Sequence, residues 1–101
     1  MSISALPSND GQELTIQIQG RFDFSAHQEF RDAYERVNMT PKRYVVDLKA
    51  ATYLDSSALG MLLLLRDHAG GDHSDVRVIN SNSDVRKILA ISNFEKLFDI
   101  S

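Results

Sequence analysis

The sequence predicts an α/β domain in which a small mixed β-sheet is covered by helices. Residues 14–19 alternate apolar and polar side chains with period two, which is typical of a strand with one buried face. Residues 44–48 have a continuous apolar centre, as expected of a parallel strand that is buried on both faces. Segments with helical spacing separate the later strands, and strands that alternate with helices pair in parallel through right-handed crossovers.

The chain is expected to begin with a β-hairpin. Residues 3–6 form a short strand, which Pro7 and the turn-forming residues 8–11 interrupt. The strand at 14–19 follows, and the Asp-Gly turn is suited to pairing these two strands as a hairpin. Gly20 is expected to end the second strand.

A helix is predicted after this hairpin. Ser25 and Gln28 have the spacing of a capping box, which satisfies otherwise unpaired amide groups in the first turn. Residues 38–41 are expected to stop the helix, because the residue before a proline disfavours helical backbone. The side chains predicted to face the core recur at helical spacing, and they are Ala26, Phe30, Ala33, Tyr34 and Val37.

The strand at 44–48 is predicted to lead to a second helix. The chain is expected to cross residues 49–54 as a connection and then to form a helix from about residue 56 to residue 69. Gly70 and Gly71 are a strong signal for its end.

The remaining chain predicts a strand, a helix and a short edge strand. Residues 76–79 are the strand, and Ser83 is expected to cap the helix. Asn93 suits the end of that helix because it tolerates a left-handed conformation. Residues 97–100 are the edge strand, and the apolar stripe of the helix consists of Val85, Ile88 and Leu89.

The composition indicates a single domain over residues 1–101, since this length supports one core. The net charge is −3 and charges of both signs are interleaved, which argues against a nucleic-acid partner. The chain has no cysteine, so disulfides and thiolate metal sites are excluded. The apolar run near Leu62 is shorter than the roughly 20 residues of a membrane span, and no signal peptide is evident. We therefore expect a cytoplasmic protein without membrane insertion.

The sequence has few groups suited to catalysis, so the protein is not expected to be an enzyme. It contains no phosphate-binding glycine loop, and Ser56 and Ser57 lack the flanking glycines of a nucleophile elbow. His68 and His73 straddle a predicted helix end and form a poor ligand pair, so neither a metal nor a cofactor is expected. A receiver domain is disfavoured because Asp47 lies inside a predicted strand and no early acidic pair is present.

The junction at residues 53–65 is the most informative stretch, because polar groups there precede an unusually apolar helix. Asp55 or Ser56 is suited to cap that helix by residue type alone. Covering a sheet requires an apolar stripe only about 100° wide. Some apolar side chains, among them Met61 and Leu64, are therefore expected to reach solvent and mark a partner site, unless a loop covers them.

A serine at the start of this helix is also suited to phosphorylation. Free amide groups and the positive end of the helix dipole stabilise a phosphate there. The modification adds about −1.5 to −2 charges beside the apolar surface, and Asp55 and Asp23 would increase the charge density that an acidic partner meets. We therefore predict a switch that abolishes docking and leaves the fold intact.

These residues resemble the signature of STAS domains, and most closely that of the bacterial anti-sigma factor antagonists. Residues 55–60 read Asp-Ser-Ser-Ala-Leu-Gly, where the family usually has Asp-Ser-Ser-Gly-Leu-Gly. Residues 20–23 resemble the Gly-x-Leu-Asp element after the second strand, and residues 85–94 resemble the final helix and its exit. The resemblance covers essentially the whole chain and implies a STAS fold with the order β-β-α-β-α-β-α-β.

The resemblance implies specific site residues. The phosphoacceptor of the family is the first serine after the aspartate, which is Ser56 here, with Ser57 as the alternative. Ala58 departs from the glycine that is usual in the family and could alter the approach of a kinase. The residues expected to contact a partner are Asp23, Asp55, Ser57, Ala58, Met61 and Leu64.

The function implied by the resemblance is that of an anti-sigma factor antagonist. The unphosphorylated form would bind an anti-sigma factor and free the sigma factor, a serine kinase acting on Ser56 would cancel binding, and a PP2C-type phosphatase would restore it. A monomer is expected. The alternative is a STAS subunit of a lipid or solute transport complex, which would use the fold as a scaffold without phosphorylation. Nucleotide binding has no motif to support it.

Overall fold

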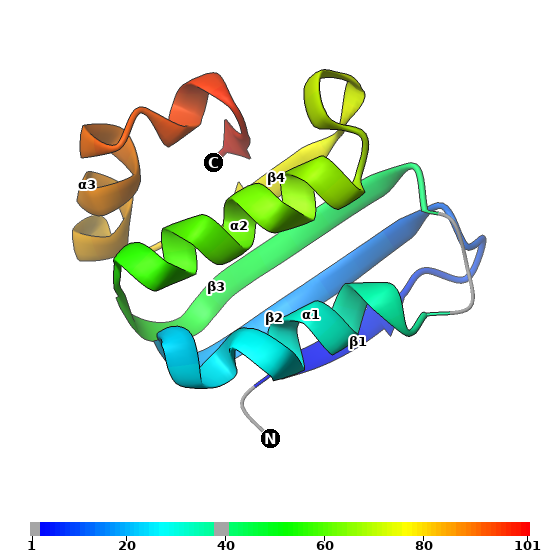
Figure 1. The fold of residues 1–101 in the computed structure, drawn as a ribbon, viewed down its shortest axis with the longest axis horizontal. Helices are drawn as coiled ribbons and strands as arrows, with labels where there is room; N and C mark the ends of the chain where they lie inside the picture. Colours follow the sequence, from blue (N-terminus) through cyan, green and yellow to red (C-terminus); the bar gives the residue numbers. More distant parts are fainter. Residues whose placement is uncertain (1–2, 38–40) are drawn as a thin grey trace.

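In the computed structural model, which describes residues 3–37 and 41–101, five strands form one mixed sheet in the order β1-β2-β3-β4-β5 (Figure 1). The strands are β1 (Ile3–Pro7), β2 (Glu13–Phe22), β3 (Arg43–Leu54), β4 (Val76–Ile79) and β5 (Asp99–Ile100). The α-helices are α1 (His27–Glu35), α2 (Ser56–His68) and α3 (Ser83–Ile91). Short 3-10 turns lie at η1 (Phe24–Ala26), η2 (Gly71–His73) and η3 (Phe94–Lys96).

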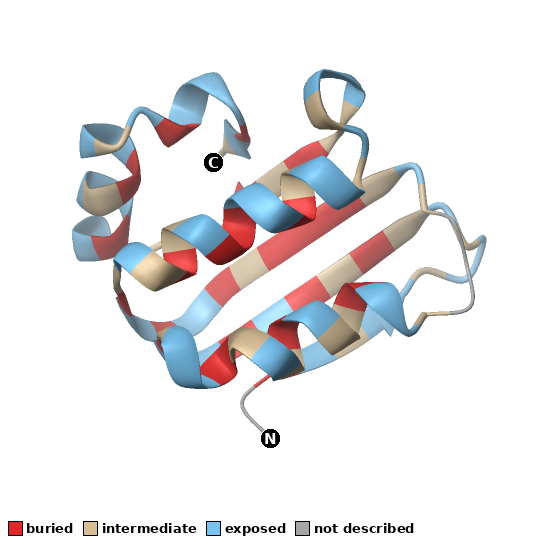
Figure 2. Cartoon of the chain, viewed as in Figure 1, coloured by how far each residue is buried: buried red, intermediate tan, exposed pale blue. Residues whose placement is uncertain are grey.

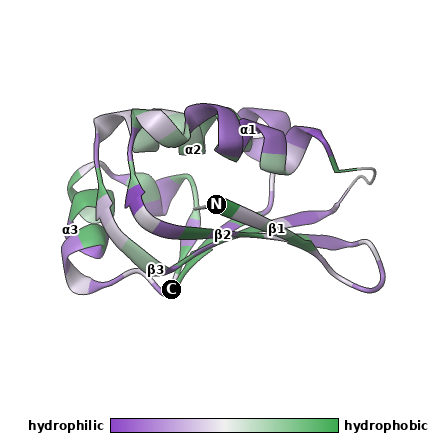
Figure 3. Ribbon diagram, turned by 90° about the horizontal axis from the view of Figure 1, so that it is seen from below, coloured by the Kyte–Doolittle hydropathy of each residue, from purple (hydrophilic) through white to green (hydrophobic). Residues whose placement is uncertain are grey.

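Helices α1 and α2 lie together on one face of the sheet, and α3 lies at one end of it (Figures 1 and 3). Strands β1 and β2 pair antiparallel, and all later neighbours pair in parallel. Buried residues lie on the sheet and on α1 and α2, and they form one hydrophobic core (Figure 2). The predicted α/β fold, with its N-terminal hairpin and parallel remainder, is confirmed.

Two predictions about strands β2 and β3 were wrong. Gly20 does not end β2, and residues 49–54 are not a connection, because both strands run on together to the pair Phe22 and Leu54. Strand β2 has ten residues and β3 has twelve, and the two extra residues of β3 lie at the register shifts opposite positions 17–19 and 20–21. Each bulge interrupts the period-two pattern of β3, which is why its second half does not look like a strand in the sequence.

The start of α1 also differs from prediction. The proposed capping box of Ser25 and Gln28 is absent: Asp23 caps η1 instead, and Gln28 bonds Asp32. The end of α1 is Glu35, and residues 38–40 of the expected stop lie outside the described part of the chain. The expected core side chains of α1 do pack inward, with Phe30 and Tyr34 buried.

The C-terminal elements follow the prediction closely. Strand β4 has the expected bounds, and α3 buries Val85 and Leu89. Its cap is Asn82, one residue before the predicted Ser83, and the Asn82 side chain accepts a hydrogen bond from the Val85 N–H. Asn93 has the left-handed conformation expected of it, with φ of 60°. The last strand, β5, is shorter than the predicted 97–100 segment.

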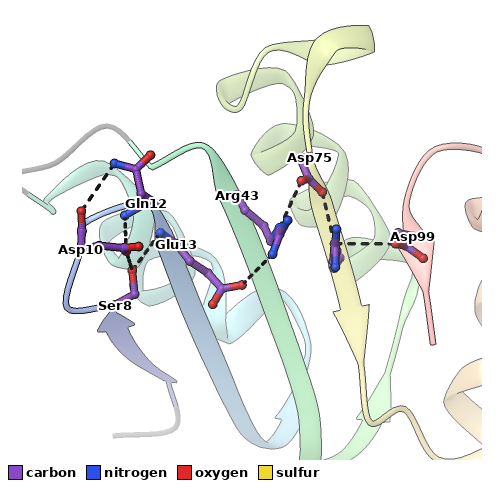
Figure 4. A network of polar contacts seen from close by, with 8 residues as sticks. Ser8, Asp10, Gln12, Glu13, Arg43, Asp75 and Asp99 are labelled. Carbon is purple, nitrogen blue, oxygen red and sulfur yellow. Dashed lines mark hydrogen bonds and ion pairs between the residues drawn. The ribbon is translucent and has the colours of Figure 1, made fainter.

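The amino ends of the parallel strands are joined by charged side chains (Figure 4). Arg43 contacts Glu13 at 3.7 Å and Asp75 at 3.1 Å, and Arg77 contacts Asp75 at 3.4 Å and Asp99 at 3.7 Å. Positive and negative groups therefore alternate across four strands. All these groups are partly exposed, so each pair stabilises the fold only modestly.

Two glycines provide a test of the backbone geometry. Gly20 has a φ of +78°, whereas Gly60 lies inside α2, and neither position has an atom within 4 Å of an added Cβ. Gly20→Ala should therefore destabilise the protein by about 1 kcal/mol, because its backbone disfavours a side chain. Gly60→Ala should stabilise it by about 0.5–1 kcal/mol. Urea unfolding measures both, and equal effects of the two changes would contradict the assigned backbone at Gly20.

Candidate functional site

The two central strands end side by side and are followed by two similar turns. Phe22 pairs with Leu54, and the N–H of Asp55 donates to the carbonyl of Phe22 at 3.4 Å. Each strand is followed by an aspartate with extended backbone, Asp23 after β2 and Asp55 after β3. The structure therefore brings both aspartates to the carboxyl edge of the sheet, where sites on open parallel sheets usually lie.

Asp55 is the cap of α2. Its Oδ1 accepts hydrogen bonds from the N–H of Ala58 at 3.0 Å and from the hydroxyl of Ser57 at 2.6 Å. Of the two residues suited to the cap by type, Asp55 or Ser56, the structure selects Asp55. The hydroxyl of Ser57 is thus turned toward the cap, and Ser57 is half-buried.

Ser56 has a different environment from its neighbour. It is the first residue of α2 and is exposed to solvent. The first N–H groups of an α-helix lack an acceptor within the helix, and the dipole places partial positive charge at this end. The hydroxyl of Ser56 therefore lies where a negatively charged group is stabilised.

Asp23 forms the equivalent turn after β2. Its Oδ1 accepts hydrogen bonds from the N–H of Ser25 at 3.0 Å and from the Ser25 hydroxyl at 2.5 Å. The guanidinium of Arg21 lies 3.4 Å from Oδ2. The hydrogen bonds from Ser25, with a smaller effect of Arg21, hold the pKa of Asp23 below its ordinary value, so this carboxylate remains ionised.

Two exposed aromatic rings lie at the same edge. Phe24 is 70% exposed and stacks on His27, with ring centroids 5.5 Å apart. Tyr53 is 41% exposed, and the guanidinium of Arg21 lies 4.3 Å from the centre of its ring. Sequence reasoning missed both rings. The signal that could have found Phe24 is the repeated Asp-x-Ser spacing, which places Phe24 and Ser56 at equivalent positions of the two turns.

The apolar surface of α2 was predicted only in part. Ala58, Met61, Leu62 and Leu65 are buried, with Met61 only 3% exposed. The side chains of Ala58 and Met61 therefore do not form the partner surface expected of them, because their spacing puts them on the stripe that faces the sheet. Leu64 is 50% exposed and lies on the outer side, as predicted.

The described residues contain no group of three or more histidine, cysteine, aspartate or glutamate side chains arranged to hold a metal ion. Within residues 3–37 and 41–101, no helix has the length and apolarity that crossing a membrane requires.

Comparison with known proteins identifies relatives of the whole chain. The family model described as "Mlab, STAS domain" matches residues 6–99. A STAS-domain containing protein of Pseudomonas aeruginosa strain UCBPP-PA14 is 76% identical over 101 residues, which cover all of both chains.

Solved structures with low sequence identity share the fold. An anti-sigma factor antagonist from Mycobacterium paratuberculosis aligns with a TM-score of 0.75 and 19% identity, over 98% of this chain and 85% of the other. A sulfate transporter family protein from Wolinella succinogenes aligns with a TM-score of 0.73 and 14% identity, over 93% and 80% of the two chains. The same fold thus occurs in proteins described by two different functions.

The two faces of α2 can be tested with a matched pair of substitutions. Met61→Ala should lower the free energy of unfolding by about 2–5 kcal/mol, because it leaves a cavity under the helix. Leu64→Ala should change it by less than about 0.5 kcal/mol, because that side chain is half exposed. Urea unfolding distinguishes the two cases, and similar losses for both would contradict the assigned helix phase.

The Asp23 turn can be tested by titration. Ser25→Ala should raise the pKa of Asp23 toward its ordinary value and leave that of Asp10, which is lowered by Ser8, unchanged. Because the pKa of Asp23 is lower in the folded chain, its ionised form stabilises the fold above the unfolded pKa, and this contribution is lost as pH falls through the folded pKa. Carboxyl ¹³C NMR measures both titrations, and an unmoved Asp23 would argue against the Ser25 hydrogen bonds.

Proposed function

This chain belongs to the STAS domain family, and from that premise we propose that it is a phosphorylation-controlled anti-sigma factor antagonist. The unphosphorylated protein, a cytoplasmic monomer, binds an anti-sigma factor and thereby releases a sigma factor. A serine kinase modifies Ser56 and cancels binding, and a PP2C-type phosphatase restores it. The protein acts as a binding module and as a substrate of the two enzymes.

The observation that carries this proposal is the different state of the two adjacent serines. The hydroxyl of Ser57 donates to Asp55 at 2.6 Å and is half-buried. Ser56 is exposed at the helix start, where a kinase can reach its hydroxyl. Phosphorylation at Ser57 would also remove a hydrogen bond to the α2 cap, whereas phosphorylation at Ser56 leaves the cap in place. Ser56 is therefore the phosphoacceptor in this proposal.

The position of Ser56 explains how a phosphate changes binding without changing the fold. The positive end of the α2 dipole offsets part of the added charge. On a docking surface, however, about −1.5 to −2 charges must lose water when a partner binds. Burying an unpaired charge costs far more than the dipole returns. The helix tolerates the modification, and the interface does not.

A second function is favoured by the structural similarity to a sulfate transporter family protein. In that case the protein is a STAS subunit of a lipid or solute transport complex, and the same edge serves as a fixed docking surface. The exposed serine at the head of α2 favours the switch, since a scaffold has no need of an accessible hydroxyl there.

The switch predicts distinct results for the two serines. Incubated with ATP and the anti-sigma factor kinases encoded in the same genome, the wild type and Ser57→Ala should be phosphorylated at Ser56, and Ser56→Ala should not. Phosphorylation should weaken anti-sigma factor binding by about 100-fold or more, because an unpaired buried charge costs about 3 kcal/mol or more. Phosphosite mapping by mass spectrometry and titration calorimetry measure these effects.

Circular dichroism of the phosphorylated protein serves as the control, and its spectrum and melting temperature should remain close to those of the unmodified protein. Phosphate found on Ser57, or equal affinity of both forms for the anti-sigma factor, would refute the switch. Binding of Ser56→Ala and Ser56→Asp to a transporter ATPase with the same affinity would instead support the transport subunit.

A further inference from the structure

The charged groups at the carboxyl edge are already compensated within the protein. Residues 20–25 and 53–58, which form the two strand ends and turns, contain three charged side chains. Arg21 and Asp23 pair with each other at 3.4 Å, and Arg21 also lies over the ring of Tyr53. Asp55 accepts two hydrogen bonds at the head of α2. None of these three groups requires an opposite charge from a partner.

The carboxyl edge exposes two aromatic rings that a partner could contact, those of Phe24 and Tyr53. The ring of Tyr53 lies under the guanidinium of Arg21, which pairs with Asp23, and Phe24 is the next residue in the chain after Asp23. Phe24 is exposed, and its ring stacks on that of His27 at the start of α1. Exposed tyrosine, phenylalanine and arginine next to polar groups are typical of the residues that dominate binding energy.

We propose that Phe24 and Tyr53 are the specificity-determining anchors of this surface, and that they enter an uncharged apolar pocket on the partner protein. This inference rests on the proposed function, in which the Ser56 edge is the binding surface. Phe24 occupies in the first turn the position that Ser56 occupies in the second, so an anchor and a modifiable hydroxyl lie on neighbouring turns. The partner therefore meets the ring and the hydroxyl together.

An uncharged pocket also determines how phosphorylation acts. A phosphate on Ser56 adds about −1.5 to −2 charges to these two turns, and the α2 dipole offsets only part of them. Docking would then force a dianion out of water without a counter-ion, and this desolvation alone opposes binding. Repulsion by an acidic partner is not required. The two mechanisms differ in their response to salt, because screening weakens repulsion between exposed charges but does not remove a desolvation penalty.

Affinities of variants test the anchors. Anti-sigma factors and transporter ATPases of the same genome are purified and titrated with the wild type by calorimetry, and any partner found is then titrated with the variants. Phe24→Ala should weaken binding by about 30-fold or more, as expected of an aromatic anchor. Tyr53→Phe, which keeps the ring, should bind within about twofold of the wild type, and Tyr53→Ser should lose at least about tenfold.

Ile91→Ala is the matched control, because Ile91 is 82% exposed but lies at the end of α3, outside the two turns. Its affinity should stay within about twofold of the wild type. Melting temperatures confirm that each variant is folded. Loss of affinity in Ile91→Ala equal to that in Phe24→Ala would overturn the assignment of Phe24 as an anchor.

Salt titrations test the uncharged pocket. The dissociation constant of the unphosphorylated protein should change by less than about threefold between 0.1 and 0.5 M NaCl, and the defect of the phosphorylated protein should persist at 0.5 M. Recovery of binding at high salt would show repulsion by an acidic partner and refute the pocket.

The outcomes separate this inference from the proposed function. If an anti-sigma factor binds but Phe24→Ala binds equally well, the inference fails and the proposed function stands. If only a transporter ATPase binds, and Phe24→Ala weakens that binding, the proposed function fails and the assignment of Phe24 and Tyr53 as anchors is supported. If the wild type binds no partner of either class, both are refuted.

Discussion

The register between β2 and β3 is the constraint on which the rest of the site depends. Two bulges in β3 shift the register between the strands by two residues, and as a result Phe22 pairs with Leu54 at the ends of the strands. A slip of one residue would move side chains to the opposite face of the sheet. With this register, buried Phe22 and Leu54 close the core, and the next residue of each strand is an aspartate that starts a turn. The bulges therefore place the turn that carries Ser56 next to the turn that carries Phe24.

The two ends of the sheet are built differently. At the amino ends, alternating charges from Glu13 to Asp99 join four strands (Figure 4). At the carboxyl ends, the carboxylates turn inward to cap the turns, and the aromatic rings turn outward. An ion-pair network at a binding edge would have to be desolvated during docking, which is costly. The network lies at the opposite end, and the proposed binding edge carries the Arg21–Asp23 pair instead, so less charge would have to be desolvated there.

Elements whose position depends on a local sequence pattern were predicted correctly. Elements whose position depends on pairing with a neighbouring strand were not. Strand 76–79 and the extent of α2 follow from short apolar runs and a Gly-Gly stop, and both were correct. The second half of β3 was missed because its buried residues fall at 48, 51 and 54, a spacing of three that bulges impose. Such spacing depends on the neighbouring strand, which a single sequence does not display. Met61 was misplaced because a leucine-rich helix does not reveal its phase until Ala58 is known to face the sheet.

The site residues were predictable to the same degree. The Asp-Ser-Ser motif indicated the junction at 55–57 as a candidate site, but the sequence does not show the hydrogen bond from Ser57 to Asp55 on which the proposed choice of Ser56 rests. That bond engages one of two chemically identical hydroxyls, and the cap that accepts it also fixes the start of the helix. The carboxylate of Asp55 thus caps α2 and accepts the hydrogen bond of the Ser57 hydroxyl, whereas Ser56 is exposed. Because the cap of α2 does not involve the Ser56 hydroxyl, a phosphate added there can change the surface while the helix remains in place.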